Sequence, residues 1–466
     1  MAADAKQLGS AFDPTTFGVF RFLSRDLDAH GRVTLRYALD DGLRFEEQFE
    51  LPLAGEVVGP ERARLDGLLS LLHWVAGVSY FKMAAPLEIA CEGGAPGPAA
   101  AALLEALYSE GLGEFAYTNS LPELPRPHFP VDPVKAADGG EERAPARLDR
   151  VLVPVGGGKD SAVALEILRR SAGRDVTLFS IGDAPPIART AAVADLPHLI
   201  VRRRLDPKLS ELNSLGALNG HIPITAIVSC VALLTAALHG FDAVAMANER
   251  SASSGNLSWD GIEVNHQFSK GLRAERLLSD AVAEAQAGEE GQAGVSIFSV
   301  LRPASELAIA RAFAQMERYH GAFTSCNAIF RLDPSLRAAS WCCDCPKCRF
   351  VFLVLAPFCS PEHLREIFGR DLLEEDGQFE GFALLTASGG HKPFECVGEE
   401  QESLAALRLL AEDPRWKDHR VLQRLVTEIL PQHSPGAGNP QAMLALSDEH
   451  DVPDALMEDV RALLGA

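Results

Sequence analysis

The residues whose types and order most directly suggest chemistry form the run Gly156-Gly157-Gly158-Lys159-Asp160-Ser161. Glycines let the backbone approach a phosphate closely, and a lysine adds a positive charge. The apolar run 151–155 predicts a buried strand before the loop, and residues 162–168 predict a helix after it. A strand, a glycine loop and a helix N-terminus direct backbone N–H groups at one point, which suits an anion. We therefore expect a phosphate-binding loop, the alternative being an ordinary turn with Asp160 or Ser161 as the helix cap.

This run differs from the two best-known nucleotide loops. Val153 stands where a Walker A loop has its first glycine, and Asp160 replaces the Ser or Thr after the lysine. The contiguous glycines also exclude the dinucleotide fingerprint. The run resembles the PP-loop, Ser-Gly-Gly-x-Asp-Ser, of the ATP pyrophosphatase superfamily, with Gly156 in place of the first serine. That resemblance implies cleavage of ATP between its α and β phosphates, with adenylation of a substrate and release of pyrophosphate.

Polar residues also follow the predicted strand 243–247. Asn248-Glu249-Arg250-Ser251 offers a carboxylate, a guanidinium and a hydroxyl, which suit Mg²⁺ and substrate oxygens. A surface loop with capping Ser and Asn is the alternative. In Asn265–Lys270, His266 and Lys270 are four residues apart and would share a face if this segment were helical. His221, at the start of a predicted core helix, marks a second helix N-terminus that could hold an anion.

Three cysteines have the spacing of metal ligands. Cys342, Cys345 and Cys348 form Cys-x2-Cys-x2-Cys, which suits Zn²⁺. Cys326 is a candidate for the fourth ligand, whereas Cys343 adjoins Cys342 and would strain to bind the same ion. A structural zinc is the expectation, and buried free thiols are the alternative.

The composition limits the partners. The chain has 466 residues, nine cysteines and a formal net charge of −21. This acidic balance is unfavourable for nucleic acid and favours a small-molecule substrate. The apolar run 222–241 is interrupted by polar residues, which predicts a core helix rather than a membrane span. With no secretory signal pattern at the N-terminus, we expect a cytoplasmic protein that binds neither nucleic acid nor membrane. The sequence leaves the oligomeric state open.

The elements that must position these residues predict an α/β fold. Strand-like runs alternate with helical ones, which predicts a doubly wound, mainly parallel sheet with ligands beyond the carboxyl ends of its strands. The expected strands are 151–155, 176–181, 199–201, 243–247 and 295–300, and the expected helices are 162–170, 222–238, 271–287 and 304–319.

Four segments are expected along the chain. Residues 1–121 predict an α+β domain with a hairpin that turns at Asp40-Asp41-Gly42 and helices from Pro60 and Pro98. Residues 122–147 are a proline-rich linker, and 148–357 are the ATP-binding domain. Residues 358–466 are a helical region that contains a polar, glycine-bearing loop at 388–398, which we expect to bind substrate.

Together these stretches resemble one PP-loop family, the UDP-N-acetylmuramoyl-L-alanyl-L-glutamate epimerases of bacterial peptidoglycan synthesis. The segments that carry the resemblance are Val155–Ser161, Asn248–Ser251, Val264–Lys270, Arg302–Glu306, Cys345–Phe350, His391–Gly398 and, near the N-terminus, Gly77–Lys82. The cysteine run also resembles the zinc-binding end of 7-cyano-7-deazaguanine synthases, although glycine usually stands there in place of Cys343.

The resemblance implies an ATP- and Mg²⁺-dependent epimerase. It would convert the terminal L-Glu of the UDP-muramoyl dipeptide to D-Glu through an acyl-adenylate, with release of AMP and pyrophosphate. Adenylation removes the negative charge of the carboxylate, so the neighbouring Cα–H bond becomes easier to ionise. The rivals are another PP-loop reaction, such as nucleobase cyanation or transfer RNA thiolation, and a non-catalytic nucleotide-binding module. The acidic charge counts against the first, and the intact Lys159-Asp160-Ser161 against the second.

The candidate site residues fall into four groups. Those for catalysis are Lys159, Asp160, Glu249 and the proton-transfer pool His266, Lys270, His391 and Cys396. Those for ATP are Gly156, Gly157, Gly158, Lys159, Asp160, Ser161, Asp183 and His221. Those for the substrate are Asn248, Arg250, Ser251, Asn265, Gln267, Arg302, Glu306, Lys392 and Glu395. Asp160 and Glu249 are expected to bind Mg²⁺, and Cys326, Cys342, Cys345 and Cys348 the structural Zn²⁺.

Overall fold

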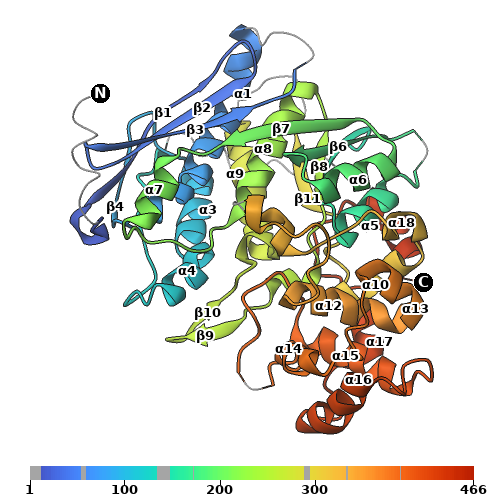
Figure 1. Ribbon diagram of the computed structural model, residues 1–466. Helices are drawn as coiled ribbons and strands as arrows, with labels where there is room; N and C mark the ends of the chain where they lie inside the picture. Colours follow the sequence, from blue (N-terminus) through green and yellow to red (C-terminus); the bar gives the residue numbers. More distant parts are fainter. Residues whose placement is uncertain are drawn as a thin grey trace. The chain divides into compact units, whose positions relative to one another are not determined.

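A computed structural model describes residues 12–53, 59–133, 147–171, 173–287, 294–331, 334–388 and 390–465, with the side chains of 59–64 left out (Figure 1). Residues 134–146 of the predicted linker and Gly389 of the predicted substrate loop lie outside these ranges. No helix in the described part of the chain is long and apolar enough to cross a membrane.

The chain is α/β, with many helices and a large, mostly parallel sheet. Nine strands form this sheet in the order β11-β8-β5-β6-β7-β3-β2-β1-β4. They are β1 (Val19–Leu27), β2 (Arg32–Leu39), β3 (Leu43–Glu50), β4 (Glu88–Cys91), β5 (Arg150–Pro154), β6 (Asp175–Ile181), β7 (His198–Arg204), β8 (Ala243–Met246) and β11 (Ser296–Ser299). Each of the five strands expected between residues 151 and 300 is present, with shifted ends.

Two pairings show how the N-terminal strands join this sheet. β2 and β3 form the predicted hairpin, with Arg32 opposite Glu50 and Leu39 opposite Leu43. β3 then pairs antiparallel with β7, with Gln48 opposite Arg204. The hairpin prediction is confirmed, whereas the β3–β7 pairing had no signal in the sequence because it joins segments about 150 residues apart.

The helices are α1 (Gly59–Ala76), α2 (Val78–Phe81), α3 (Pro98–Tyr108), α4 (Gly113–Thr118), α5 (Lys159–Leu168), α6 (Pro185–Ala194), α7 (Lys208–Ser214), α8 (Ile224–His239), α9 (Leu272–Ala285), α10 (Glu306–Ala314), α11 (Glu317–His320), α12 (Pro346–Leu355), α13 (Pro361–Phe368), α14 (Phe379–Leu384), α15 (Glu400–Glu412), α16 (Arg420–Arg424), α17 (Pro440–Leu444) and α18 (Asp454–Leu464). A small second sheet pairs β9 (Leu257–Trp259) with β10 (Ile262–Val264).

The chain divides into two compact units that do not follow one another along the sequence. Unit 1 comprises Met1–Leu152, Leu199–Val244 and Trp259–Ile297, and unit 2 comprises Val153–His198, Ala245–Ser258 and Phe298–Ala466. The segment boundaries expected at 121, 147 and 357 stay predictions.

In unit 1, helices α1, α3, α8 and α9 pack together, and α1 also covers β1. Buried aromatic rings fill the space between helix and sheet. Tyr37 stacks on Tyr80 at a ring distance of 5.0 Å, and the ring of Phe22 stands edge-on to His73 at 5.4 Å. This apolar core therefore encloses His73, whose Nε2 lies 3.1 Å from the carbonyl of Arg36.

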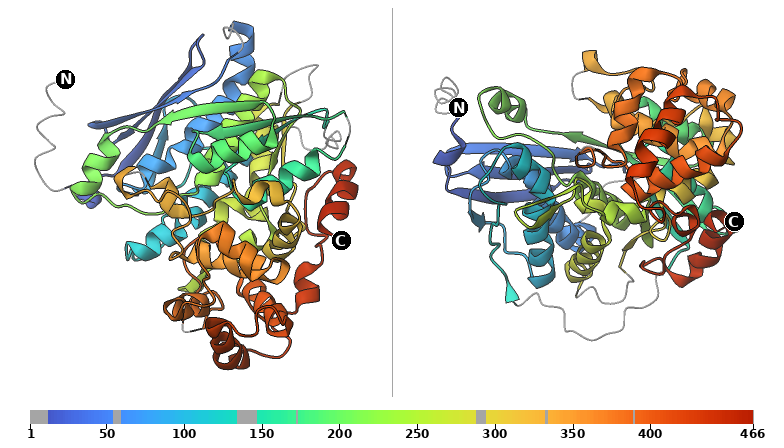
Figure 2. Two further views of the ribbon diagram at one scale, coloured as in Figure 1. Left: turned by 45° about the vertical axis from the view of Figure 1, so that its right-hand side comes forward. Right: turned by 90° about the horizontal axis from the view of Figure 1, so that it is seen from below.

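Helix α10 is the centre of unit 2, where it contacts α5, α12, α15, α17 and α18. Figure 2 shows the helices after residue 346, coloured orange to red, gathered together. Ser305 caps α10 by accepting from the N–H of Ala308, so the helix begins at Glu306. The expected helix 304–319 is therefore shorter, and α11 forms separately after it. Since α10 is surrounded by other helices, its first residue, Glu306, is buried.

Candidate active site

The glycine run forms a loop between β5 and α5, in unit 2. Gly157 has a φ of 80°, a conformation that favours glycine, and Gly158 is the N-cap of α5. No side chain of the described residues caps this helix, so neither Asp160 nor Ser161 acts as the N-cap. At Gly156, a Cβ would meet no described atom within 4 Å. The loop thus leaves open space at Gly156, close to a helix N-terminus, and this geometry suits a phosphate.

Lys159 is buried and points toward two carboxylates of the same unit, the partly exposed Asp160 and the buried Glu306. Its Nζ contacts both Asp160 and Glu306, and its side chain is 1% exposed. Burial alone would lower the pKa of Lys159, but Asp160 and Glu306 raise it above its usual range. Lys159 is therefore a fixed cation beside the glycine loop.

Glu306 joins this cation to a second lysine. Lys347 Nζ lies 3.7 Å from Glu306 Oε1. Burial, followed by the charge of Asp160, raises the pKa of Glu306, and Glu249 acts in the same direction. The sequence placed Glu306 among the substrate ligands, and it gave no reason to single out Lys347. In the structure both belong to the charged group around Lys159.

The predicted substrate loop lies against the other polar segments of unit 2. Asn256 Nδ2 donates to the carbonyl of Pro393 over 2.7 Å, and Asn327 Nδ2 contacts Glu395. Lys392 is buried, and its lowered pKa results from burial, opposed by acidic residues that include Glu402 and Glu249. The structure therefore brings the 248–256 and 391–398 segments together.

Glu402 was not singled out by sequence. It lies at the start of α15, where it forms a capping box with Glu399, and its Oε1 accepts from the N–H of Glu306 over 2.7 Å. Its burial and the charges of Glu399 and Glu306 raise its pKa to about 8. The only signal in the sequence was the acidic spacing of a capping box.

The remaining candidates in unit 2 differ in their hydrogen-bond partners. Arg302 is buried and donates to the carbonyl of Glu249 over 2.6 Å, and Asn248 Nδ2 donates to Ser299 Oγ over 2.9 Å. Ser251 Oγ is buried and has no hydrogen-bond partner among the described residues. Asp183 follows β6, where its charge acts on His198. Arg302 and Asn248, both predicted to bind substrate, therefore make hydrogen bonds that join the 248–249 segment to the 299–302 segment.

Arg250, His391 and Cys396 complete the candidates in unit 2. Arg250 donates from its backbone N–H to the carbonyl of Ala304, and its guanidinium lies 3.3 Å from the carbonyl of Ala445. His391 Nδ1 lies 3.0 Å from the carbonyl of Lys392, and Cys396 is partly exposed.

Four cysteine sulfurs converge in unit 2. The Sγ atoms of Cys326, Cys342, Cys345 and Cys348 all lie within 4.8 Å of one another. The structure therefore brings Cys326 to the predicted three-cysteine run. Cys343 lies apart, because its Sγ donates instead to the carbonyl of Phe368 over 3.3 Å.

The other predicted residues belong to unit 1. Two of them, His221 and His266, form a histidine cluster with Glu114. The rings of His221 and His266 are 4.1 Å apart, and His266 Nδ1 contacts Glu114. Burial and then the charge of His266 lower the pKa of His221 to about 3, so His221 is neutral. A carboxylate that orients one imidazole is the arrangement of a general base. Glu114 had no signal in the sequence.

Lys270 and Lys82 also act on this cluster, since the positive charges of both lower the pKa of His221. Residues 268–270 form only a short 3-10 turn, so the helical face that would have paired His266 with Lys270 is absent from this described segment. Lys270 Nζ lies 3.4 Å from Gln267 Oε1, and the backbone N–H of Gln267 donates to Asn265 Oδ1.

Lys82 is buried in unit 1. Its ammonium donates to Asn219 Oδ1 over 2.6 Å, and burial lowers its pKa to about 8. Lys82 was not among the predicted site residues, although it ends one of the stretches that carry the family resemblance.

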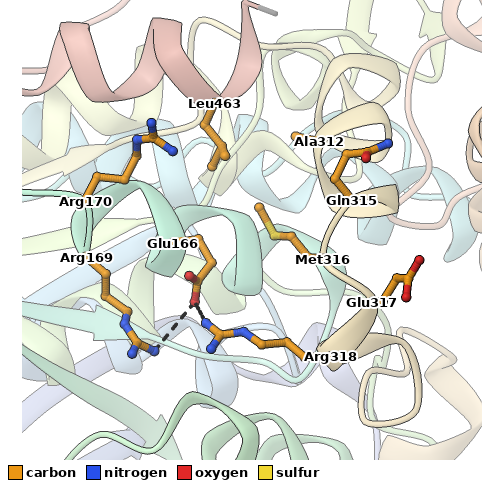
Figure 3. A pocket seen from close by; sticks show the side chains of 9 residues that line it. All are labelled: Glu166, Arg169, Arg170, Ala312, Gln315, Met316, Glu317, Arg318 and Leu463. Atoms are coloured by element: carbon orange, nitrogen blue, oxygen red, sulfur yellow. Dashed lines mark hydrogen bonds and ion pairs between the residues drawn. The ribbon is translucent and has the colours of Figure 1, made fainter.

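An open pocket of about 680 Å³ lies elsewhere in unit 2, among α5, α10, α11 and α18 (Figure 3). Arg169, Arg170 and Arg318 contribute to its wall, and Glu166 pairs with two of them. None of the predicted site residues lines it.

The donor set around the glycine loop fits a nucleotide with a divalent cation. The open backbone and the cation Lys159 suit phosphate oxygens. Carboxylates are the ligands that Mg²⁺ prefers, and Asp160 and Glu249 both act electrostatically on Glu306. The group therefore offers both signs of charge that a metal–phosphate complex needs.

Two family models match the chain. The MurL N-terminal domain matches residues 11–293, and the MurL C-terminal domain matches residues 322–439. No solved structure matches the chain.

Three curated proteins are similar over most of their length, and each is named UDP-N-acetyl-alpha-D-muramoyl-L-alanyl-L-glutamate epimerase. The protein of a Micromonospora species is 46% identical over 93% of this chain and 96% of its own length. That of Salinispora tropica is 47% identical over 88% of both chains. That of Xanthomonas oryzae pv. oryzae is 44% identical over 97% of this chain and 99% of its own.

Proposed function

The chain belongs to the UDP-N-acetyl-alpha-D-muramoyl-L-alanyl-L-glutamate epimerase family, and on this basis we propose that it inverts the terminal glutamate of that UDP-muramoyl dipeptide at the expense of ATP. The reaction serves peptidoglycan synthesis. The observation that carries the ATP dependence is the buried Lys159–Asp160–Glu306 group beside an open glycine loop of the PP-loop type.

The proposed first step activates the substrate. A carboxylate oxygen of the terminal glutamate attacks the α-phosphorus of ATP, the bond to the β-phosphate oxygen breaks, and pyrophosphate leaves. The loop N–H groups with Lys159 and Ser161 hold the departing phosphates. Asp160, Glu249 and Glu306 would hold Mg²⁺, which supplies charge neutralisation when it is bound.

Epimerisation follows at the α-carbon. The acyl group lacks the negative charge of the free carboxylate, so a base removes the α-proton more easily, and an acid returns a proton to the opposite face. Water then attacks the acyl carbonyl, and AMP leaves. The proton-transfer groups belong to the pool His266, Lys270, His391 and Cys396. Of these, His266 contacts the carboxylate of Glu114 in unit 1.

Turnover in D₂O tests this proposal. The full-length protein, the L-glutamyl substrate, ATP and Mg²⁺ should yield AMP, pyrophosphate and D-glutamyl product with deuterium at the glutamate α-carbon. Free L-glutamate is the control acceptor, and we expect it to react poorly, because the distant muramoyl and uridyl groups supply binding energy.

Two results would contradict the proposal. Deuterium incorporation without ATP would remove the need for adenylation. AMP release without deuterium at the α-carbon would indicate ligation or hydrolysis instead of epimerisation.

A further inference from the structure

The four converging sulfurs have the dimensions of a metal centre. The Sγ atoms of Cys342 and Cys348 are 3.7 Å apart. In a tetrahedral site with Zn–S bonds of about 2.3 Å, two sulfurs lie about 3.8 Å apart. A disulfide would need about 2.05 Å, and no disulfide joins the described cysteines. The spacing therefore fits four ligands of one ion rather than a pair of bridged cysteines.

The backbone around the sulfurs is shaped for such an ion. Cys343 has a φ of 58°, which costs a non-glycine residue about 1–2 kcal/mol. This turn directs its own side chain toward Phe368 and leaves Cys342 and Cys345 on the same side as Cys348. The N–H of Cys348 points at Cys345 Sγ over 3.4 Å. Strain that keeps ligands convergent, and an N–H directed at a sulfur, both favour bound thiolates.

Cys345 also lies at the N-terminus of a ten-residue helix. It is the N-cap of α12, whose first turn contains Cys348. The positive end of the helix dipole stabilises negative charge at both sulfurs. Soft thiolate ligands in a four-sulfur set select Zn²⁺ among the common divalent ions.

The same residues connect this cluster to the glycine loop. Cys326 follows Thr324, whose N–H donates to the carbonyl of Gly157 over 2.9 Å. A Cβ at Gly158 would lie 2.7 Å from Ser325 Oγ, so the two segments are in close contact. On the other side, Lys347 lies between two of the cysteines and reaches Glu306.

We propose that Cys326, Cys342, Cys345 and Cys348 bind one structural Zn²⁺, and that this ion holds the Thr324–Cys326 segment and Lys347 in place beside the phosphate-binding loop. The zinc has a positioning role, since its ligand set is complete and leaves no open coordination place for substrate. Loss of the ion would release both supports of the loop at once.

Metal analysis of the full-length protein tests the site. Protein purified without chelator should contain about one zinc per chain. Cys345→Ser should lose it, while Cys359→Ser, a buried cysteine outside the cluster, should keep it. If Cys345→Ser does not fold, replacement of zinc by Co²⁺ in the parent protein should give thiolate charge-transfer absorption. Iron in place of zinc, a full zinc equivalent in Cys345→Ser, or a Co²⁺ spectrum without thiolate bands would overturn the site.

Hydrogen exchange tests the positioning role without turnover, so its outcome is independent of the proposed reaction. When zinc is removed with a mercurial and a chelator, the amides of residues 155–162 should exchange roughly tenfold faster or more. The β2–β3 hairpin in unit 1 is the internal control and should be unchanged. Equal exchange of residues 155–162 with and without zinc would overturn the positioning role.

Discussion

The protonation state of Lys159 is decided by its neighbours. A lysine buried without partners would lose its proton, whereas two carboxylates keep Lys159 charged. A fixed cation of this kind is useful only if an anion approaches it, because a buried ion pair adds little stability by itself. The open space at Gly156 in the neighbouring glycine loop would let an anion approach Lys159. We therefore propose that Lys159 serves phosphate binding.

Lys159→Gln should reduce AMP formation by the full-length protein on the order of 100-fold or more, because the charge that would meet the phosphates disappears. The substitution also removes the cation that contacts both Asp160 and Glu306 and leaves Lys347 as the cation beside Glu306, so it should lower thermal stability too. Quantified AMP release, normalised to folded protein, measures the effect.

Lys417→Gln is the matched control, because Lys417 is exposed in the same unit. It should retain the parent rate. AMP formation by Lys159→Gln at the rate of Lys417→Gln would refute the assignment of Lys159.

Among the elements, the loop between β5 and α5 depends most on backbone conformation. Gly157 has a positive φ, and a Cβ there would lie 2.6 Å from the carbonyl carbon of Pro186 at the start of α6. Gly156 has neither restriction. The middle glycine is thus required by the fold, whereas the space beside the first one is open.

Gly157→Ala should lower the free energy of unfolding by at least about 1–2 kcal/mol, the cost of a left-handed conformation, with a further cost from the contact with α6. Gly156→Ala, as its control, should change it by less than about 1 kcal/mol. Chemical denaturation compares the two variants, and equal stabilities would show that the loop can relax around a Cβ.

For the whole chain, buried histidines in unit 1 predict sensitivity to acid. Burial lowers the pKa of His73 to about 4, from a usual value of 6.5. The unfolded chain therefore binds a proton near pH 6.5 that the folded chain does not bind. The free energy of unfolding consequently falls as the pH decreases from 6.5 toward 4. His221, with a pKa of about 3, acts in the same direction.

Between pH 7 and pH 5 His73 should contribute about 2 kcal/mol to this loss. His73→Gln should reduce the pH dependence of urea denaturation by that amount. His128→Gln, at a side chain that is 88% exposed, should keep the parent dependence. If His73→Gln and the parent lose the same stability on acidification, His73 is protonated in the folded protein.

The sequence by itself determined the local units of this protein. The strand, glycine loop and helix at 151–168, the β2–β3 hairpin and the three-cysteine run all rest on residues close together in the chain. Glycine conformation, alternation of apolar residues and ligand spacing operate at that range. These patterns were enough to predict the α/β class and, through the family resemblance, the epimerase family.

Only the tertiary structure decided which distant residues meet. It pairs β3 with β7, sets Glu306 against Lys159 and places Glu114 beside His266. Such contacts depend on how helices and strands pack, and no periodicity along the chain encodes the partner across a gap of 150 residues. The charge states also depend on this packing, because it buries His73 and sets two carboxylates against Lys159.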